Sequence, residues 1–383
     1  MKNMKLKGFY KLLSLLLIAV LVLSAVGFVA SGRESSSTKP DSGNVGNTAG
    51  EADENKNGTN DNDAENPGQD SSTTTDEDKT PPSDNATGDI FLSKITGLGI
   101  TEAEYNTIPK GIVVDPIHPI YGISKSDLIV EFPIEDGSSR LVAYTTNAEV
   151  MWKIGSLRAT RSFISNMSNF FGGVVVAYGN DDKVVYDAWE TKDIVLDLSQ
   201  YSDCYYIENT LYVYTTENMV DVAINRMSAS SNLIGYKNAP YTFSDEKMSG
   251  VTDALKVAIP YSVDNITNLH YNELSEKYLY YKGDARRMDM LTGENVAFTN
   301  VFVLFSNATT YENSDGTELV MDTVSGGRGY YISMGGLTEF VWSTDKNGEL
   351  VFTDLRGEVL KVNRGNAYIA YYKASLASNV NFS

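Results

Sequence analysis

Residues 126–146 read "SDLIVEFPIEDGSSRLVAYTT", and this stretch decides the fold. Two apolar runs rich in β-branched residues flank the polar sequence "EDGSS" at 135–139, which is typical of the turn of a β-hairpin. Further along, "VVVAYG" at 174–179 reads as a buried strand. The segment before that strand has apolar residues at intervals of three and four, which predicts a helix with one buried face. These apolar residues are Phe163, Ile164, Met167, Phe170 and Phe171.

The ends of this helix carry their own signals. Ser156 is the candidate N-cap, and Gly172 with Gly173 would stop the helix before the next strand. A second helix is predicted over 216–229, because four apolar residues share one of its faces: Met219, Val222, Ala223 and Met227. Residues 90–245 are therefore predicted to form a mixed α/β domain.

The residue pattern of the sequence changes after that domain. Short β-branched and aromatic runs such as "KYLYYKG", "NVFVLFSN" and "AYIAYYK" alternate with Gly, Asp and Asn turns. Residues 246–376 are therefore predicted to form a largely antiparallel β domain, followed by a tail at 377–383. The fold class that these patterns predict is α+β, with an N-terminal mixed α/β domain and a C-terminal β domain.

The first 32 residues are predicted to lie outside the globular part. They combine four lysines with an uncharged apolar run at 12–30, which is the pattern of an export signal. At about 1.5 Å per residue the run is long enough to cross a bilayer. It either stays as a membrane anchor or is cleaved and leaves a secreted protein. The lysines before it place the rest of the chain on the extracellular side of the cell membrane.

Residues 33–89 are predicted to be a disordered acidic linker. They contain fourteen acids, four bases and no aromatic residue, so they cannot bury enough apolar surface to fold. The whole chain carries −19; the first 32 residues carry +4 and the linker −10, which leaves −13 for the rest. A strongly acidic folded part argues against nucleic acid as a partner.

The sequence gives little support for a metal site or for a catalytic nucleophile. The chain has one cysteine, Cys204, and two histidines, His118 and His270, and none has a partner at the spacing of metal ligands. We therefore predict no metal site, no cofactor and no catalytic residue. Enzymatic activity stays open, and a binding role is favoured.

Residues 153–163, "KIGSLRATRSF", place two arginines three positions apart in this acidic chain. If Ser156 caps the helix, Arg158 and Arg161 lie in its first two turns and on one face. The N-terminus of a helix already carries partial positive charge, so cations there suit an incoming anion. The two guanidinium groups would then bind a phosphate or a carboxylate.

Three further residues complete this candidate ligand site: Arg140, Glu131 and Asp127. Arg140 would be another anion contact, and Glu131 would position the arginines. The alternative is internal pairing, in which Asp127, Glu131 and Glu135 neutralise the three arginines and form a structural salt-bridge cluster. The two interpretations remain open, since a partly satisfied cluster still leaves donors for a ligand.

These stretches resemble the YerB-like family of bacterial envelope lipoproteins, which are built from two domains of unknown function. The resemblance covers roughly residues 95–373. In the first domain it follows the family pattern A-D-[IV]-V-Y-E…E-G-G-I-T-R and then G-P-[IV]-R-S-A-R, through Asp127, Glu131, Glu135, Gly137, Arg140, Gly155, Arg158 and Arg161. In the second domain it runs through Tyr281, Asp289, Thr292, Gly293, Asn300, Gly327, Gly329 and Trp342.

The resemblance implies an envelope location and two domains, and it implies no reaction. Three features depart from the family pattern. "FVASGRES" at 28–35 lacks the lipobox cysteine, so anchoring would fall to the apolar run. "AYGNDD" at 177–182 replaces a His-Ala-Gly-Gly stretch, and "ARRMD" at 285–289 replaces a Pro-His pair. The loss of both histidines weakens an enzymatic interpretation.

The leading hypothesis is a non-enzymatic envelope protein that binds an anionic cell-wall polymer or another wall-derived ligand. A phosphotransferase or pyrophosphatase acting on lipid-linked wall precursors is the alternative. The order of Ser-Asp, strand, Arg and Ser-x-x-Arg distantly resembles the LytR-CpsA-Psr phosphotransferases, and Asp127 would be the acid/base or metal ligand. A scaffold for another envelope protein, which would use the open edges of the β domain, is a third hypothesis.

Overall fold

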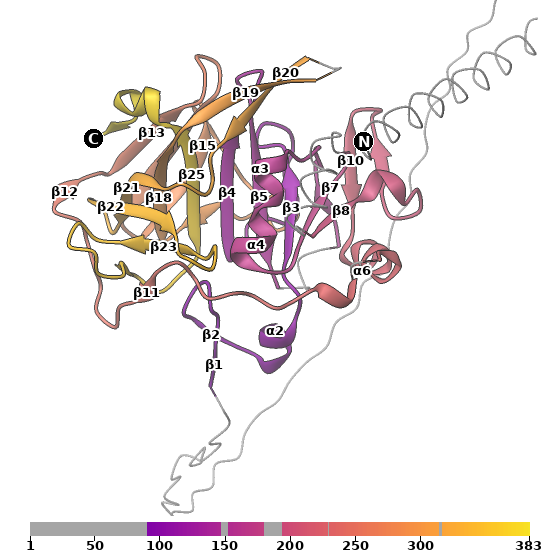
Figure 1. The fold of residues 1–383 in the computed structure, drawn as a ribbon, viewed down its shortest axis with the longest axis horizontal. Coiled ribbons are helices and arrows are strands. Elements are labelled where there is room, and N and C mark those ends of the chain that lie inside the picture. Colours follow the sequence, from indigo (N-terminus) through magenta and orange to yellow (C-terminus); the bar gives the residue numbers. More distant parts are fainter. Residues whose placement is uncertain (1–89, 147–151, 180–193, 229, 314–315) are drawn as a thin grey trace, which may run out of the picture. The chain divides into compact units, whose positions relative to one another are not determined.

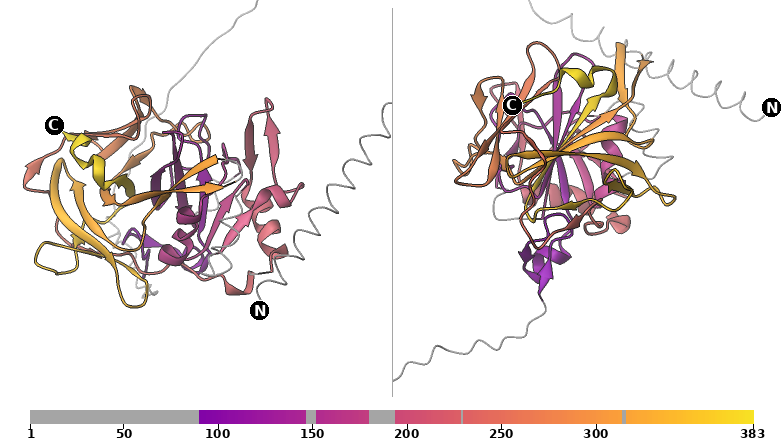
Figure 2. Two further views of the ribbon diagram at one scale, coloured as in Figure 1. Left: turned by 45° about the horizontal axis from the view of Figure 1, so that its top comes forward. Right: turned by 90° about the vertical axis from the view of Figure 1, so that its left-hand side faces the viewer.

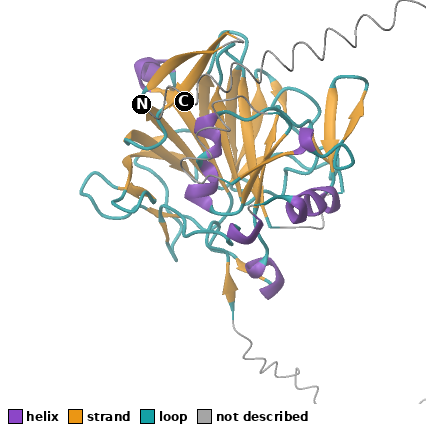
Figure 3. Ribbon diagram, turned by 45° about the vertical axis from the view of Figure 1, so that its right-hand side comes forward, coloured by secondary structure: helices purple, strands orange, loops and turns teal. Residues whose placement is uncertain are grey.

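The structure is a computed structural model that describes residues 90–383 except 147–151, 180–193, 229 and 314–315. The predicted anchor at 12–30 and the predicted linker at 33–89 lie outside the described residues. The described part is mostly β-sheet with a few short helices (Figure 3), and several of its sheets are largely antiparallel. The mixed α/β character of residues 90–245 stays a prediction.

An eleven-stranded central sheet takes strands from both halves of the described chain. In the N-terminal half these are β3 (Lys110–Val114), β4 (Leu128–Pro133), β5 (Ser139–Thr145), β7 (Val174–Ala177) and β8 (Val195–Asp197). In the C-terminal half they are β12 (Thr252–Asp253), β18 (Asn300–Ser306), β21 (Gly327–Ser333), β22 (Gly336–Thr344), β23 (Leu350–Thr353) and β25 (Ala367–Lys373). The order is β12-β22-β21-β18-β25-β4-β5-β3-β7-β8, with β23 beside β22.

Strand β25 joins the two halves. It pairs with β18 on one side and β4 on the other, and both pairings are parallel. Figures 1 and 2 show this yellow strand among the orange strands of the C-terminal half and the purple strands of the N-terminal half. The boundary between the two predicted domains, near residue 246, stays a prediction. The central sheet contains strands from both sides of that position in the sequence.

A second, six-stranded sheet belongs to the C-terminal half. Its strands are β13 (Lys256–Pro260), β14 (Ile266–Asn272), β15 (Lys277–Lys282), β16 (Ala285–Arg286), β17 (Ala297–Phe298) and β26 (Asn381–Phe382). All of its pairings are antiparallel. Residues 377–383, predicted as a tail, contribute β26 at one edge of this sheet.

Smaller sheets surround these two. A three-stranded sheet contains β6 (Ile154–Gly155), β9 (Tyr206–Glu208) and β10 (Tyr212–Thr215). The two-stranded sheets pair β1 (Phe91–Leu92) with β2 (Gly99–Ile100), β11 (Thr242–Phe243) with β24 (Lys361–Val362), and β19 (Ala308–Asn313) with β20 (Gly316–Met321). The α-helices are α2 (Glu102–Asn106), α3 (Ser162–Ser165), α4 (Met167–Phe171) and α6 (Glu217–Arg226), and 3₁₀ turns cover 198–200, 230–232 and 374–379.

The predicted hairpin and the predicted second helix are both confirmed. Strands β4 and β5 pair antiparallel on either side of the 135–138 turn. Gly137 has φ +79° there, a value that favours glycine. Helix α6 begins after Thr216, whose side chain accepts a hydrogen bond from the Met219 N–H, and it buries Val220 and Ala223.

The predicted start of the first helix is wrong. Helix α3 begins at Ser162, with Arg161 as its N-cap residue and no side-chain capping bond. Residues 154–157 are extended instead: Gly155 pairs with Tyr214, and the Leu157 N–H donates to the Val213 carbonyl at 2.8 Å. Ser156 is therefore committed to an extended segment and cannot cap a helix. Because α3 has only four residues, the argument from a helix N-terminus no longer applies to Arg158.

The central sheet has a buried core on each face. Alternating residues of one strand point to opposite faces, so Leu141 and Ala143 belong to one core, and Val142 and Tyr144 belong to the other. The first core packs the central sheet against the six-stranded sheet and α6. The second packs it against α3 and α4, which lie over the central strands in Figure 1.

Gly173, just after α4, occupies a position that only glycine fits. Its φ is +68°, and an added Cβ would lie 1.9 Å from the Pro109 carbonyl oxygen. Gly173→Ala is expected to destabilise the protein by about 2 kcal/mol more than Gly348→Ala does. Gly348 has a similar φ of +79°, but nothing lies within 4 Å of its added Cβ. Urea unfolding of both variants measures the difference, and equal losses would show that the close approach at Pro109 is unimportant.

Candidate functional site

Three arginines gather at one end of the central sheet. Arg140 lies in β5, Arg158 follows β6, and Arg161 directly precedes α3. Burial lowers the pKa of Arg140, and the charges of Arg161 and Arg158 lower it further, whereas Asp115 raises it. The three guanidinium groups and the Asp115 carboxylate are therefore within electrostatic reach of one another.

Arg158 is held by residues that follow β3. Its Nε donates to Asp115 Oδ2 at 2.9 Å, and its Nη2 lies 3.0 Å from His118 Nδ1. Burial would raise the pKa of Asp115, but the Ile117 N–H bond, the Arg158 charge and His118 together lower it. Asp115 therefore stays ionised and fixes Arg158. The sequence alone does not predict that Asp115 and His118 contact Arg158, although both residues lie in one short turn, "DPIHP".

Arg161 is paired with the turn of the hairpin. Its Nε donates to Glu135 Oε2 at 3.2 Å, and its Nη2 donates to Glu135 Oε1. Arg161 Nη1 also donates to the Thr160 carbonyl at 3.0 Å. Arg161 and Glu135 thus form the bidentate pair that the internal-pairing interpretation predicts.

Arg140 has no ion pair among the described residues. Its Nη1 donates to the Ser139 carbonyl at 3.0 Å and lies 3.4 Å from Ser138 Oγ. Its Nε is buried and has no hydrogen-bond acceptor within the described part of the chain. The Nε–Nη2 edge of a guanidinium is the edge that grips a carboxylate or phosphate with two parallel bonds. On Arg140, the Nε of that edge has no partner among the described residues.

Glu131 lies outside this arginine cluster. It faces the core beneath the six-stranded sheet, is 0% exposed, and forms an ion pair with Lys282 at 2.6 Å. It makes no hydrogen bond or ion pair with Arg140, Arg158 or Arg161. The prediction that Glu131 positions the arginines does not match this geometry, because alternation along β4 points its side chain to the other face from α3.

Asp127 is also separate from the arginines, at the opposite end of β4 from the hairpin turn. Its Oδ2 accepts from the Tyr236 hydroxyl at 2.9 Å. Burial raises the pKa of Asp127 to about 6, although the Tyr236 hydrogen bond lowers it. The phosphotransferase interpretation needs Asp127 beside an arginine-bound phosphate, and the structure does not bring them together. Asp127 instead lines a cavity of about 790 Å³.

Asp289 belongs to the pattern of the second domain, but the sequence alone predicts no role for it. It is 0% exposed, and its Oδ1 accepts from the N–H groups of Gly122 and Leu291. Its Oδ2 accepts from the Ser124 N–H at 2.8 Å. Asp289 therefore ties the loop before β4 to the C-terminal half. The spacing Asp-x-x-Thr-Gly was visible in the sequence, but its partner 165 residues away was not.

Two negative findings concern the described residues. Among them, no helix is long and apolar enough to cross a membrane, and the apolar run at 12–30 is not part of that set. Within the same residues, no three His, Cys, Asp or Glu side chains gather as a candidate metal site.

Comparisons with known proteins place the chain in a family. Models described as "Protein of unknown function (DUF3048)" match residues 95–229 with the N-terminal domain and residues 257–369 with the C-terminal domain. The Bacillus subtilis (strain 168) protein named "Putative lipoprotein YerB" is 22% identical over 278 residues, which are 67% of this chain and 79% of that protein. The crystal structure of YerB from Bacillus subtilis superposes with a TM-score of 0.66 at 20% identity, over 76% of this chain and 99% of the solved one.

The fold and the paired domain matches define a two-part protein of unknown function. The chain belongs to the YerB-like family, and it matches both the N-terminal and the C-terminal domain models of DUF3048. This confirms the family that the sequence motifs indicated.

Proposed function

We propose that this protein is tethered to the outer side of the cell membrane and binds an anionic, wall-derived ligand without transforming it. The proposal combines three supports. The family includes a relative named as a lipoprotein. The run at 12–30 has the length and composition of an export signal or anchor. The arginine cluster offers donors to an anion.

The observation that carries this proposal is Arg140, which forms no ion pair with a described residue and whose buried Nε has no acceptor among them. Two arginines of the cluster are fixed by acids, Arg158 by Asp115 and Arg161 by Glu135. Arg140 is largely desolvated, and its Nε has no acceptor among the described residues. A guanidinium in that state gains most from a phosphate or carboxylate, because the anion supplies two charge-assisted hydrogen bonds at once.

The surroundings of Arg140 favour a ligand over a purely structural role. A structural arginine is expected to be satisfied by its own fold, since buried donors without acceptors are rare in native proteins. Arg158 and Arg161 stand beside it with their orientations already fixed by Asp115 and Glu135, so the surroundings of Arg140 are preorganised before an anion binds. A wall polymer with repeated phosphates or carboxylates has the chemistry to use such a site.

Arg140→Met is expected to weaken binding to purified cell-wall sacculi about tenfold or more, because it removes a charge-assisted hydrogen-bond pair while it keeps the aliphatic stem. The measurement is co-sedimentation of the full chain, in non-ionic detergent, with sacculi that retain or lack their anionic polymers. Binding should also weaken as salt is raised. Arg356→Met is the matched control, since it removes an exposed arginine from the turn after β23.

Each outcome of this experiment has a clear meaning. Salt-sensitive binding that needs both the polymers and Arg140 supports the proposal. Equal sedimentation of the Arg140→Met and Arg356→Met proteins contradicts it. Binding that persists in high salt and does not need the polymers would favour the scaffold hypothesis, in which an apolar protein interface replaces the anion site.

A further inference from the structure

A polar cavity of about 790 Å³ lies at the end of β4 that is opposite the arginine cluster. Its walls come from the loop at 124–127, from the start of β15, from residues 293–297 and from residues 364–366. Small-molecule sites typically enclose about 300–1,000 Å³, so this cavity has the size of a ligand site. Neither the family resemblance nor the arginine cluster assigns it a role.

The cavity wall contains polar groups that the fold leaves unsatisfied. Ser126 is 3% exposed, and its Oγ has no hydrogen-bond partner among the described residues. Asn295 Oδ1 is likewise buried without a partner within that part of the chain. Both residues line the cavity. Buried polar atoms without partners are rare, and two that belong to the wall of the same cavity point to a missing hydrogen-bonding group.

Lys277 adds an unpaired positive charge to this wall. It is half-buried at the start of β15 and forms no ion pair or hydrogen bond with a described residue, whereas its neighbour Lys125 pairs with Glu294 at 2.6 Å. Burial lowers the pKa of Lys277, and the Lys125 charge lowers it further, while Glu294 raises it. An anionic group beside Lys277 would offset both effects.

The fold holds the two facing walls in place without help from a ligand. The Asp289 carboxylate accepts from the Gly122 and Ser124 N–H groups, and Ser124 Oγ lies 3.0 Å from Thr292 Oγ1. These contacts fix the loop that carries Ser126 against the loop that carries Asn295. A preformed cavity spares a ligand much of the ordering entropy that binding otherwise loses.

We propose that this cavity binds a carboxylate-bearing sugar unit of a glycan. The Lys277 ammonium would pair with the sugar carboxylate, Asn295 Oδ1 would accept from a ring hydroxyl, and the Ser126 hydroxyl would exchange a hydrogen bond with another. The remaining polar lining includes hydroxyl and amide groups, which match the hydroxyls of a sugar: Thr96, Ser124, Ser275, Thr299 and Asn366. The other polar residues of the lining are charged: Lys125, Asp127, Glu294 and Arg364.

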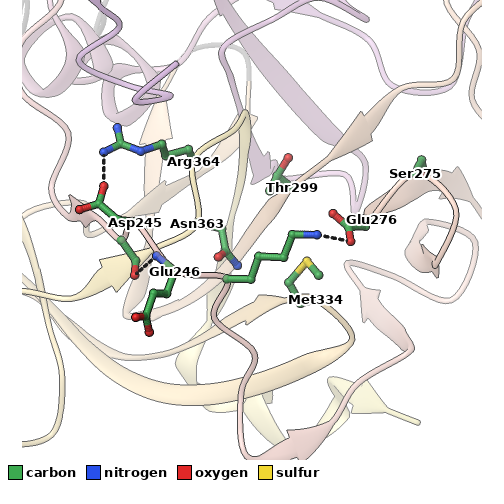
Figure 4. Close-up of a pocket in the computed structure, with 10 residues that line it drawn as sticks. Asp245, Glu246, Ser275, Glu276, Thr299, Met334, Asn363 and Arg364 are labelled. Carbon is green, nitrogen blue, oxygen red and sulfur yellow. Dashed lines mark hydrogen bonds and ion pairs between the residues drawn. The ribbon is translucent and has the colours of Figure 1, made fainter. Parts of the chain in front are cut away.

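A neighbouring cavity favours a chain of sugars over a single unit. It has a volume of about 250 Å³ and shares Ser275, Thr299 and Arg364 with the larger one. Figure 4 shows two ion pairs among its side chains: Arg364 with Asp245, and Lys247 with Glu276. Because its two basic side chains are already paired, this smaller cavity suits a neutral sugar next to the acidic one.

The test is isothermal titration calorimetry of the full chain in detergent with a tetrasaccharide of alternating glucuronate and N-acetylglucosamine. Chitotetraose is the neutral match, and the dipeptide alanyl-alanine supplies a carboxylate without a sugar. Lys277→Met is expected to weaken binding of the acidic tetrasaccharide about tenfold. Lys256→Met, which removes an exposed lysine from β13, should leave it unchanged, and so should Arg140→Met.

Ser126→Ala and Asn295→Leu separate a ligand site from a structural one. Each removes a buried polar atom that has no partner, so thermal stability should be kept or increased while tetrasaccharide binding is lost. The proposal is overturned if no oligosaccharide binds at millimolar concentration, if only the dipeptide binds, or if Lys277→Met and Asn295→Leu bind like the unaltered protein. Because Arg140 belongs to the other site, failure here and failure of the proposed function are distinguishable.

Discussion

Lys282→Met is expected to lower the free energy of unfolding by about 3–5 kcal/mol, because it leaves the Glu131 carboxylate buried without a counter-charge. Glu131 is 0% exposed and Lys282 is 9% exposed. Lys282 Nζ lies 2.6 Å from Glu131 Oε1. Burial lowers the pKa of Lys282, and the Glu131 charge raises it, so the ion pair is what keeps the ammonium charged.

A network of hydroxyl groups makes this pair more than a local contact. Four hydroxyls donate to the Glu131 carboxylate: Ser139 Oγ, Thr267 Oγ1, Tyr280 OH and Tyr368 OH. They come from β5, β14, β15 and β25, so the network ties the two sheets and both halves of the described chain to one buried charge. Removal of the ammonium leaves this whole set oriented around an uncompensated anion.

The control for this prediction is Lys247→Met. Lys247 and Glu276 are 69% and 44% exposed, so breaking their ion pair should cost less than about 1 kcal/mol. Urea unfolding compares the two variants. The double variant Glu131→Leu/Lys282→Met should recover much of the loss, since it removes both charges. A Lys282→Met protein within 1 kcal/mol of the unaltered protein would show that the carboxylate is neutral or solvated.

Asp127→Asn is expected to raise the free energy of unfolding at about pH 8 by up to about 3 kcal/mol, and to change little at about pH 3. Burial raises the pKa of Asp127 from 3.8 to about 6, against the lowering effect of the Tyr236 hydrogen bond. The folded state thus binds the Asp127 proton more tightly than the unfolded state does. Its contribution to stability is present below about pH 4 and is lost as the pH rises through about 6.

Two units of pKa correspond to about 3 kcal/mol, which sets the upper limit of the effect. Asparagine keeps an oxygen that accepts from the Tyr236 hydroxyl but carries no charge. Chemical unfolding at a series of pH values measures the effect, with Asp264→Asn in the exposed turn after β13 as control. Loss of stability in the Asp127→Asn protein at every pH would mean that the carboxylate is stabilised by its surroundings.

Local patterns were sufficient for elements whose partners are close in sequence. The hairpin of β4 and β5 followed from two apolar, β-branched runs around "EDGSS", and α6 followed from its apolar face. The start of α3 could not be predicted in this way. Gly155 pairs with Tyr214, which lies about 60 residues later in the sequence, and this long-range pairing overrides the helical periodicity before Phe163.

The candidate site shows the same limit. The pair of Arg161 and Glu135 lay within reach of sequence reasoning, because the hairpin turn and the arginine stretch follow each other. Glu131 was assigned to the arginines because its partner Lys282, 151 residues later, was invisible. The cavity was missed for a similar reason: its walls join residues near 125, 295 and 365, and no local spacing connects them.

The place of β25 has a consequence for how the protein is made. This strand is parallel to both of its neighbours and closes the gap between β4 and β18. Until the ribosome has produced residues 367–373, the edge of β4 has no partner, and its main-chain groups are free to pair with other chains. The central sheet is therefore completed only once residues 367–373 have been made, and until then the strands on the two sides of β25 cannot join into one sheet.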